Sequence, residues 1–157
     1  MNIRLSLIAA AAALVSFGSH AALTESNLSL ADAQKLASAA VQSCAAKNYN
    51  VTVTVVDRAG LVKAVQRMDN AGPHTVEASQ MKAYTALSTK NPSGKVMEAA
   101  QNNAGAQNMR DIPGFLLLAG GVPVKSGDQV IGAIGIGGAP GGHLDEACAV
   151  DALKVIQ

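Results

Sequence analysis

Hydrophobic residues recur every three or four positions after Ser29, a spacing that places them on one face of an α-helix. The run passes through Leu36 and Cys44 and fades near Asn48. Ser29 has the short hydroxyl side chain that often accepts hydrogen bonds from the first free amides of a helix. We therefore expect a helix over residues 29–48 with Ser29 as its N-cap.

A two-residue period replaces the helical one after position 50. Residues 51–57 and 61–67 are rich in β-branched side chains, and a short turn that contains Gly60 separates them. Two such runs joined in this way are typical of an antiparallel hairpin.

Helical spacing then returns for the middle of the chain. Residues 74–89 predict a second helix, which ends before Pro92 because the residue that precedes a proline avoids the helical conformation. Residues 93–105 predict a shorter helix, and residues 144–156 predict the last one.

Glycine marks the part of the chain between these last two helices. Ten of the fifteen glycines lie at or after Gly114, between short runs of strand-forming residues. Short glycine-containing turns connect antiparallel neighbours, whereas parallel strands need long crossovers. The strands predicted here are residues 115–119, 122–124 and 129–136.

The resulting order of elements is α-ββ-αα-βββ-α. It predicts one α+β domain in which helices flank a five-stranded antiparallel sheet. A hydrophobic content of 49% gives one domain of this length enough apolar surface for a single core.

The first 21 residues have the pattern of a secretory signal peptide. Arg4 supplies a positive charge, residues 5–18 are apolar, and small residues precede a cleavage site after Ala21. An uncleaved anchor is the alternative, but the apolar run is shorter than the roughly 20 residues that span a bilayer. We expect a periplasmic or secreted domain of residues 22–157, without a stable membrane anchor.

The charge balance argues against nucleic acid as a partner. Twelve Lys and Arg residues face eleven Asp and Glu residues, and the formal net charge is +1. Proteins that bind nucleic acid non-specifically need a basic patch to replace the counterions of the phosphates.

Two cysteines, Cys44 and Cys148, lie among apolar residues of the first and last predicted helices. An oxidising compartment permits a disulfide between them if these helices pack side by side. Two buried thiols that act as small hydrophobic residues are the alternative. The sequence leaves both interpretations open.

No set of residues predicts a catalytic site. The glycine-rich segment 132–142 fails the dinucleotide-binding pattern at Pro140, so it is either a close-packed turn or a loop that approaches a ligand. The two histidines after residue 21, His74 and His143, each lie at the start of a predicted helix. Imidazole is a common metal ligand, although most loop histidines are solvated surface residues.

A series of short motifs resembles the GlcG/HbpS family of haem (heme)-binding proteins, which is similar to the C-terminal domain of PduO-type proteins. The resemblance extends from about residue 30 to the C-terminus, with the motifs in order. They are VVDRAG at 55–60, AGP at 71–73, KAYTA at 82–86, DIPG at 111–114, AGGVPV at 119–124, IGAIG at 131–135, GAP at 138–140 and LDE at 144–146.

This resemblance implies an antiparallel sheet flanked by helices, homo-oligomers from dimers to octamers, and binding of haem or iron. Some exported members of the family supply a redox-sensing system, which implies a possible sensor-protein partner. The PduO-type proteins are linked to corrinoid metabolism, so a corrinoid is an alternative ligand.

The resemblance also implies a location for the ligand. We expect a haem pocket near Tyr84, Phe115, Gly138 and His143, with His74 or His143 as the axial ligand. Phe115 occupies the position where haem-binding members have an oxygen-bearing side chain. A Glu-x-x-Glu iron pair of those members is reduced here to Glu77 and Gln80, so the expected iron residues are Glu77 and His74.

Two other functions remain open. One is an enzyme or enzyme accessory that acts on a small oxygenated metabolite, with Lys82 and Tyr84 as the residues to test. The other is a purely structural partner whose small-residue strand 132–138 forms an interface. Because no nucleophile and base lie together in the sequence, we favour a binding protein over an enzyme.

Overall fold

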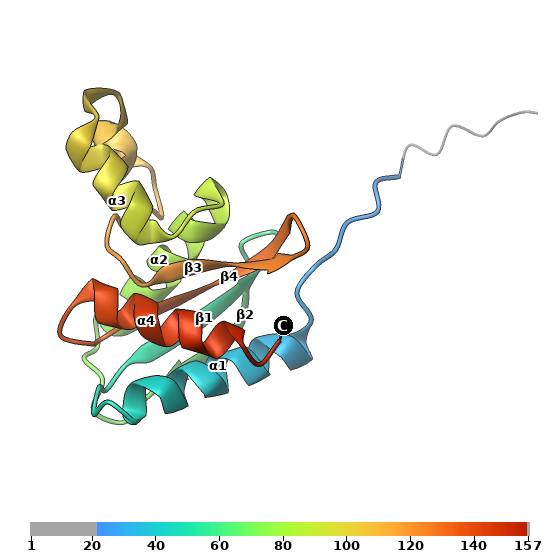
Figure 1. Cartoon of the computed structure of the whole chain (residues 1–157), viewed down its shortest axis with the longest axis vertical. Coiled ribbons are helices and arrows are strands. Elements are labelled where there is room, and N and C mark those ends of the chain that lie inside the picture. Colours follow the sequence, from blue (N-terminus) through green and yellow to red (C-terminus); the bar gives the residue numbers. More distant parts are fainter. Residues whose placement is uncertain (1–21, 157) are drawn as a thin grey trace, which may run out of the picture.

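The computed structural model describes residues 22–156, so the predicted signal peptide at 1–21 lies outside the described residues. The described part forms a single sheet with helices on both faces (Figure 1). In chain order the elements are α1 (Leu30–Ala45), β1 (Thr52–Asp57), β2 (Val62–Arg67), α2 (Thr75–Thr89), α3 (Ser93–Asn102), the 3₁₀ helix η1 (Ala104–Asp111), β3 (Gly121–Ser126), β4 (Gln129–Gly137) and α4 (Gly142–Leu153).

The sheet has four strands in the order β2-β1-β4-β3, and every neighbouring pair is antiparallel. The α+β class and the β1–β2 hairpin are therefore confirmed, whereas the prediction of five strands is wrong. Residues 115–119 form no strand because side chains of the helices bind their backbone instead. Thr85 Oγ1 accepts a hydrogen bond from the Leu116 amide at 2.9 Å, and Ser93 Oγ donates one to the Leu118 carbonyl at 2.6 Å.

Helices cover the sheet on two sides. Helices α1 and α4 lie next to each other on one face, and α2 lies on the other (Figure 1). Both faces of the central strand β1 are therefore covered, and all six of its residues are buried. Ser29 caps α1 as predicted, since its side chain accepts a hydrogen bond from the Asp32 amide at 3.1 Å.

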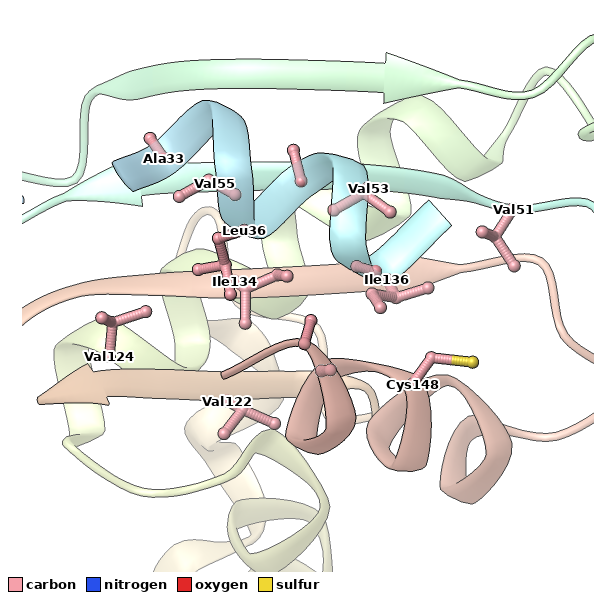
Figure 2. Close-up of a cluster of buried hydrophobic side chains, with 14 of the residues drawn as sticks. Ala33, Leu36, Val51, Val53, Val55, Val122, Val124, Ile134, Ile136 and Cys148 are labelled. Carbon is pink, nitrogen blue, oxygen red and sulfur yellow. The ribbon is translucent and has the colours of Figure 1, made fainter. Parts of the chain in front are cut away.

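The larger hydrophobic core lies between the sheet and the helices α1 and α4. Leu36 of α1 packs over Ile134 of β4, and Ile136 belongs to the same cluster (Figure 2). Cys44 and Cys148 join these two helices through a disulfide with a Cα–Cα distance of 5.6 Å. The structure thus decides the question that the sequence left open, in favour of the disulfide.

The opposite face of the sheet approaches α2 much more closely. A Cβ atom at Gly135 of β4 would overlap the Ser79 carbonyl oxygen and lie 2.5 Å from the Ala83 amide nitrogen. Hydroxyl pairs fill part of this contact, including Thr54 Oγ1 and Ser79 Oγ at 2.7 Å. The small residues of β4 are therefore required for the helix to sit against the strand.

Helix α3 and η1 project from one end of the sheet (Figure 1). The third helix was predicted to continue to residue 105, but α3 ends at Asn102, and Asn103 then caps η1 through a hydrogen bond from the Gly105 amide. Within residues 22–156, no helix has the length and apolar character needed to cross a membrane.

Candidate functional site

The residues predicted to form one pocket occupy three separate places. Helix α2 accounts for part of this separation, because it has His74 at its N-terminal end and Tyr84 in its second half. Ten residues of α-helix correspond to about 15 Å along the axis. His74 and Tyr84 therefore lie at different ends of the molecule's α2 face.

Tyr84 and Phe115 form the first of the three places. Their rings meet edge to face, with centroids 6.1 Å apart and an interplanar angle of 75°. Gly60 and Gly114 pack on the Tyr84 ring, since a Cβ atom at either glycine would lie 3.1 to 3.2 Å from it. The structure thus brings this predicted pair together, and Tyr84 keeps 38% of its surface exposed.

His74 and Gly138 border a second place, which we call the polar hollow. This cavity has a volume of about 540 Å³ and lies between the start of α2 and the loop before α4. Its lining includes Tyr49, Asn50, His74, Thr75, Lys82 and residues 137–142. Polar side chains such as Asn50 and Lys82 thus share its wall with apolar ones such as Leu118 and Pro140.

His143 borders the third place, which we call the apolar hollow. This cavity has a volume of about 670 Å³ and lies between α3 and α4. Its lining combines aliphatic and methionine side chains with two lysines and the carboxylates of Glu98, Glu146 and Asp151. The lining includes Lys47, Lys95, Met97, Leu118, Ala147 and Val150. Leu118 and Gly142 line both hollows, so the two cavities are neighbours.

A buried ion pair lies beside the polar hollow. Lys82 Nζ of α2 lies 2.8 Å from Asp145 Oδ2 of α4, and both side chains are at most 5% exposed. Lys82 Nζ also donates a hydrogen bond to the Ile136 carbonyl oxygen of β4 at 2.9 Å. The pair therefore ties together the two helices on opposite faces of the sheet.

Asp145 also fixes the loop that forms one wall of the polar hollow. Its Oδ1 atom accepts a hydrogen bond from the Ala139 amide at 2.9 Å. Burial raises the pKa of the Asp145 carboxyl above its ordinary value, and the charge and hydrogen bond of Lys82 oppose this increase. Gly120 packs directly on the pair, because a Cβ atom there would lie 2.9 Å from Lys82 Nζ.

This ion pair was not predicted from the sequence, although one signal for it was present. Lys82 falls at the same helical spacing as Ser79, Ala83 and Ala86, which are the small residues on the buried face of α2. A lysine on such a face needs a partner of opposite charge. The sequence did not identify Asp145 as that partner, because an acidic residue in the first turn of a helix is equally explained by its interaction with the helix dipole.

The glycine-rich segment 132–142 was interpreted either as a close-packed turn or as a loop that approaches a ligand. A Cβ atom at Gly138 would lie 2.5 Å from the Asn50 carbonyl oxygen, and one at Gly142 would lie 2.7 Å from the Ala119 carbonyl oxygen. The loop is therefore a close-packed turn. It is also a lining element of the polar hollow.

The predicted iron residues Glu77 and His74 are both exposed and lie in and next to the first turn of α2. In the part of the chain from residue 22 to 156, no three or more His, Cys, Asp or Glu side chains are grouped to hold a metal ion. In the apolar hollow, Glu146 Oε2 is buried and has no hydrogen-bond partner among the described residues.

Comparisons with known proteins give the same family as the motifs. The GlcG protein of Escherichia coli strain K12 is 35% identical over 107 residues, which cover 66% of this chain and 78% of GlcG. The crystal structure of HbpS has a TM-score of 0.83 and 37% identity, and the match covers 87% of this chain and 95% of HbpS. The crystal structure of a PduOC–haem complex has a TM-score of 0.78 and 26% identity, over 83% of this chain and 96% of PduOC.

A family model agrees with these pairwise similarities over nearly the whole described domain. The model is described as haem degrading protein HbpS-like, and it matches residues 28–154. With this extent of match, the chain belongs to the HbpS-like family.

Proposed function

We propose that this protein binds haem in the apolar hollow, with His143 as the iron ligand. The observation that carries the proposal is that the exposed His143 side chain lines this cavity together with apolar side chains. A volume of about 670 Å³ is within the range of cofactor sites, about 300–1,000 Å³.

The side chains that line the apolar hollow include types that bind haem. Met97, Leu118 and Val150 offer apolar contacts to a porphyrin ring. Lys47 and Lys95 pair with Asp151 at 3.2 Å and Glu98 at 2.9 Å in this structure, and they would exchange these carboxylates for the propionate groups of haem. The imidazole of His143 is a common ligand of haem iron, and the bound iron would supply the ligand-binding and redox chemistry. A haem complex of the similar PduOC protein supports the same ligand class.

His74 is the alternative axial ligand, and it lies at the polar hollow. The Tyr84–Phe115 pair is a third location, where a ring could stack on a porphyrin edge. Both are less suitable in this structure. The polar hollow has the smaller volume, about 540 Å³, and Tyr84 of the aromatic pair borders a cavity of only about 250 Å³.

Titration of residues 22–157 with hemin, followed by absorbance, tests the proposal. We expect a sharpened and shifted Soret band that saturates at a simple ratio of haem to subunit. His143→Ala should remove this band, because the iron loses its ligand, whereas the matched variant His74→Ala should leave it unchanged. A Tyr84→Leu variant, which removes the ring, serves as the control for the aromatic pair.

Other outcomes of the titration would assign haem to a different location. Loss of the band in His74→Ala alone would place haem in the polar hollow, and loss in Tyr84→Leu alone would place it at the aromatic pair. A broad response without saturation would contradict haem binding and would make a corrinoid the next ligand to titrate.

We further propose that the protein is exported, cleaved after Ala21 and assembled into homo-oligomers that sequester haem or present it to a sensor protein. The apolar segment 5–18 supports export, and the disulfide is of the kind that forms in oxidising compartments. The intact mass of protein recovered from the periplasm tests the cleavage, since it should correspond to residues 22–157.

A further inference from the structure

One carboxylate oxygen at the apolar hollow is buried without a partner. Glu146 belongs to α4 and lines the hollow. Its Oε2 atom is shielded from solvent and accepts no hydrogen bond from residues 22–156. A buried carboxylate oxygen without a donor is costly, and such atoms are rare in folded proteins. The position of this oxygen therefore needs an explanation beyond the stability of the fold.

The contacts of Glu146 place its carboxylate next to the first turn of α4. A Cβ atom at Gly94 would lie 2.8 Å from Glu146 Oε2 and 2.9 Å from the Ala119 Cβ atom. Ala119 in turn packs on Gly142, the residue before His143, because a Cβ atom at Gly142 would lie 3.2 Å from the Ala119 Cβ atom. Side chains of an α-helix point back towards its N-terminus, and residues three positions apart are neighbours on its surface. Glu146 and His143 are therefore neighbours on the face of α4 that borders the hollow.

His143, the proposed iron ligand, has no carboxylate partner in this structure. None of the ion pairs among residues 22–156 includes it, and its side chain is exposed. A histidine that binds a metal through one ring nitrogen almost always donates the N–H of the other nitrogen to a carboxylate, a backbone carbonyl or water. The acceptor fixes the tautomer of the ring and makes it a more basic ligand. A carboxylate that lines the same hollow would serve this purpose.

Three carboxylates are present among the described residues that line the hollow, and two of them already have partners. Glu98 is paired with Lys95 at 2.9 Å. Asp151 is paired with two lysines, at 3.0 and 3.2 Å, and it lies eight residues after His143, about 12 Å along the helix axis. Glu146 has the unpartnered oxygen and lies one turn from His143. It is therefore the carboxylate best suited to the imidazole.

We propose that Glu146 is a positioning residue that accepts a hydrogen bond from the ring N–H of His143 when the other ring nitrogen binds haem iron. This inference rests on the proposed haem site in the apolar hollow. The hydrogen bond gives the Glu146 carboxylate a donor and the imidazole an acceptor. The negative charge of the carboxylate makes His143 a more basic ligand, which stabilises ferric over ferrous iron and lowers the reduction potential.

Spectroelectrochemical titration of hemin-loaded residues 22–157 at neutral pH tests this role. Glu146→Gln keeps the shape of the side chain and removes its charge. We expect the variant to shift the ferric–ferrous equilibrium about tenfold towards ferrous iron, which raises the reduction potential by about 59 mV for one electron. In resonance Raman spectra of the ferrous form, the iron–histidine stretch should move to lower frequency, because a less basic imidazole binds iron more weakly.

Glu98→Gln is the matched control. It removes the same charge from the same hollow, but Glu98 lies on α3 and already has Lys95 as its partner. The reduction potential of this variant should change much less, and its iron–histidine stretch should stay at the wild-type frequency. Circular dichroism checks that both variants fold.

His143→Ala separates failure of this inference from failure of the proposed haem site. A saturating Soret band that persists in His143→Ala, or no such band in the wild type, would overturn both. If the band is present in the wild type and lost in His143→Ala, equal reduction potentials in Glu146→Gln and the wild type would overturn the positioning role alone. Equal shifts in Glu146→Gln and Glu98→Gln, or an unchanged iron–histidine stretch, would also overturn it, because the charge would then not act through His143.

Discussion

Individual residues in this protein are held by contacts with residues that lie far away in the amino-acid sequence. Lys82 is one residue of a motif in the sequence, but in the structure it is buried against Asp145, 63 positions away. Breaking a buried ion pair is costly because the remaining charge has no partner, whereas removing both charges is often neutral.

Lys82→Met should therefore lower the free energy of unfolding by about 3–5 kcal/mol. The double variant Lys82→Met/Asp145→Asn should regain most of that loss, because no charge is left unpaired. Urea unfolding curves of both variants measure the difference. Equal losses in the single and the double variant would mean that the lysine stabilises the fold through packing and not through its charge.

Asp151 makes the stability of the fold depend on pH, because the pKa of its carboxyl is lowered in the folded state. Hydrogen bonds from Lys154, Lys47 and Ser43 lower the pKa of its carboxyl from 3.8 to about 2. A carboxyl with a lowered pKa in the folded state stabilises the fold above its unfolded pKa, and this contribution is lost as the pH falls.

The melting temperature should consequently fall between pH 3.8 and about 2 more steeply in the wild type than in Asp151→Asn. Thermal unfolding followed by circular dichroism across this range provides the measurement. Because the pair with Lys47 is partly exposed, added salt should reduce the difference between the two proteins. Parallel pH profiles in low salt would contradict this assignment.

At the scale of elements, hydrophobic periodicity predicted every α-helix and all four strands of the sheet, with errors confined to their ends and to residues 115–119. That segment has the composition of a strand, but hydrogen bonds from Thr85 and Ser93 satisfy part of its backbone. Such contacts depend on side chains some 25 to 31 positions away, and local pattern does not contain them. The same limit applies to the site, where residues predicted for one pocket divide among three places.

The disulfide between α1 and α4 should contribute strongly to stability. It closes a loop with a sequence separation of 104 residues, and constraining an unfolded chain over such a loop is worth about 2–5 kcal/mol. Cys44→Ala/Cys148→Ala should lose this amount in urea unfolding. A reducing agent should destabilise the wild type to a similar degree and leave the double variant unchanged. No effect of reduction on the wild type would contradict the prediction.

The contact between α2 and β4 should tolerate no added carbon atom. Gly135→Ala would force its methyl group into the backbone of α2 at Ser79, and we expect a loss of about 1–3 kcal/mol or more. Gly105→Ala is the matched control, because its new methyl group would meet only the exposed side chain of Asn103 at 3.3 Å. The control should change stability by no more than about 0.5 kcal/mol. Denaturant midpoints of the two variants give the comparison.

For the whole molecule, exposed apolar side chains support self-association. Leu61 is 66% exposed and Val65 is 46% exposed, and both lie on or beside the edge strand β2. We expect light scattering of residues 22–157 to give a mass of at least two subunits. A single-subunit mass at micromolar concentration would contradict the homo-oligomer.

The close seating of α2 has a mechanical consequence for the whole molecule. The helix is blocked from moving towards β4 by Gly135 and towards β3 by Gly121, where any larger residue would overlap its backbone. The helix therefore has no room to move further towards the sheet. We expect a structural response to occupancy at either end of α2 to occur in the segments that adjoin it, residues 68–74 and 112–120.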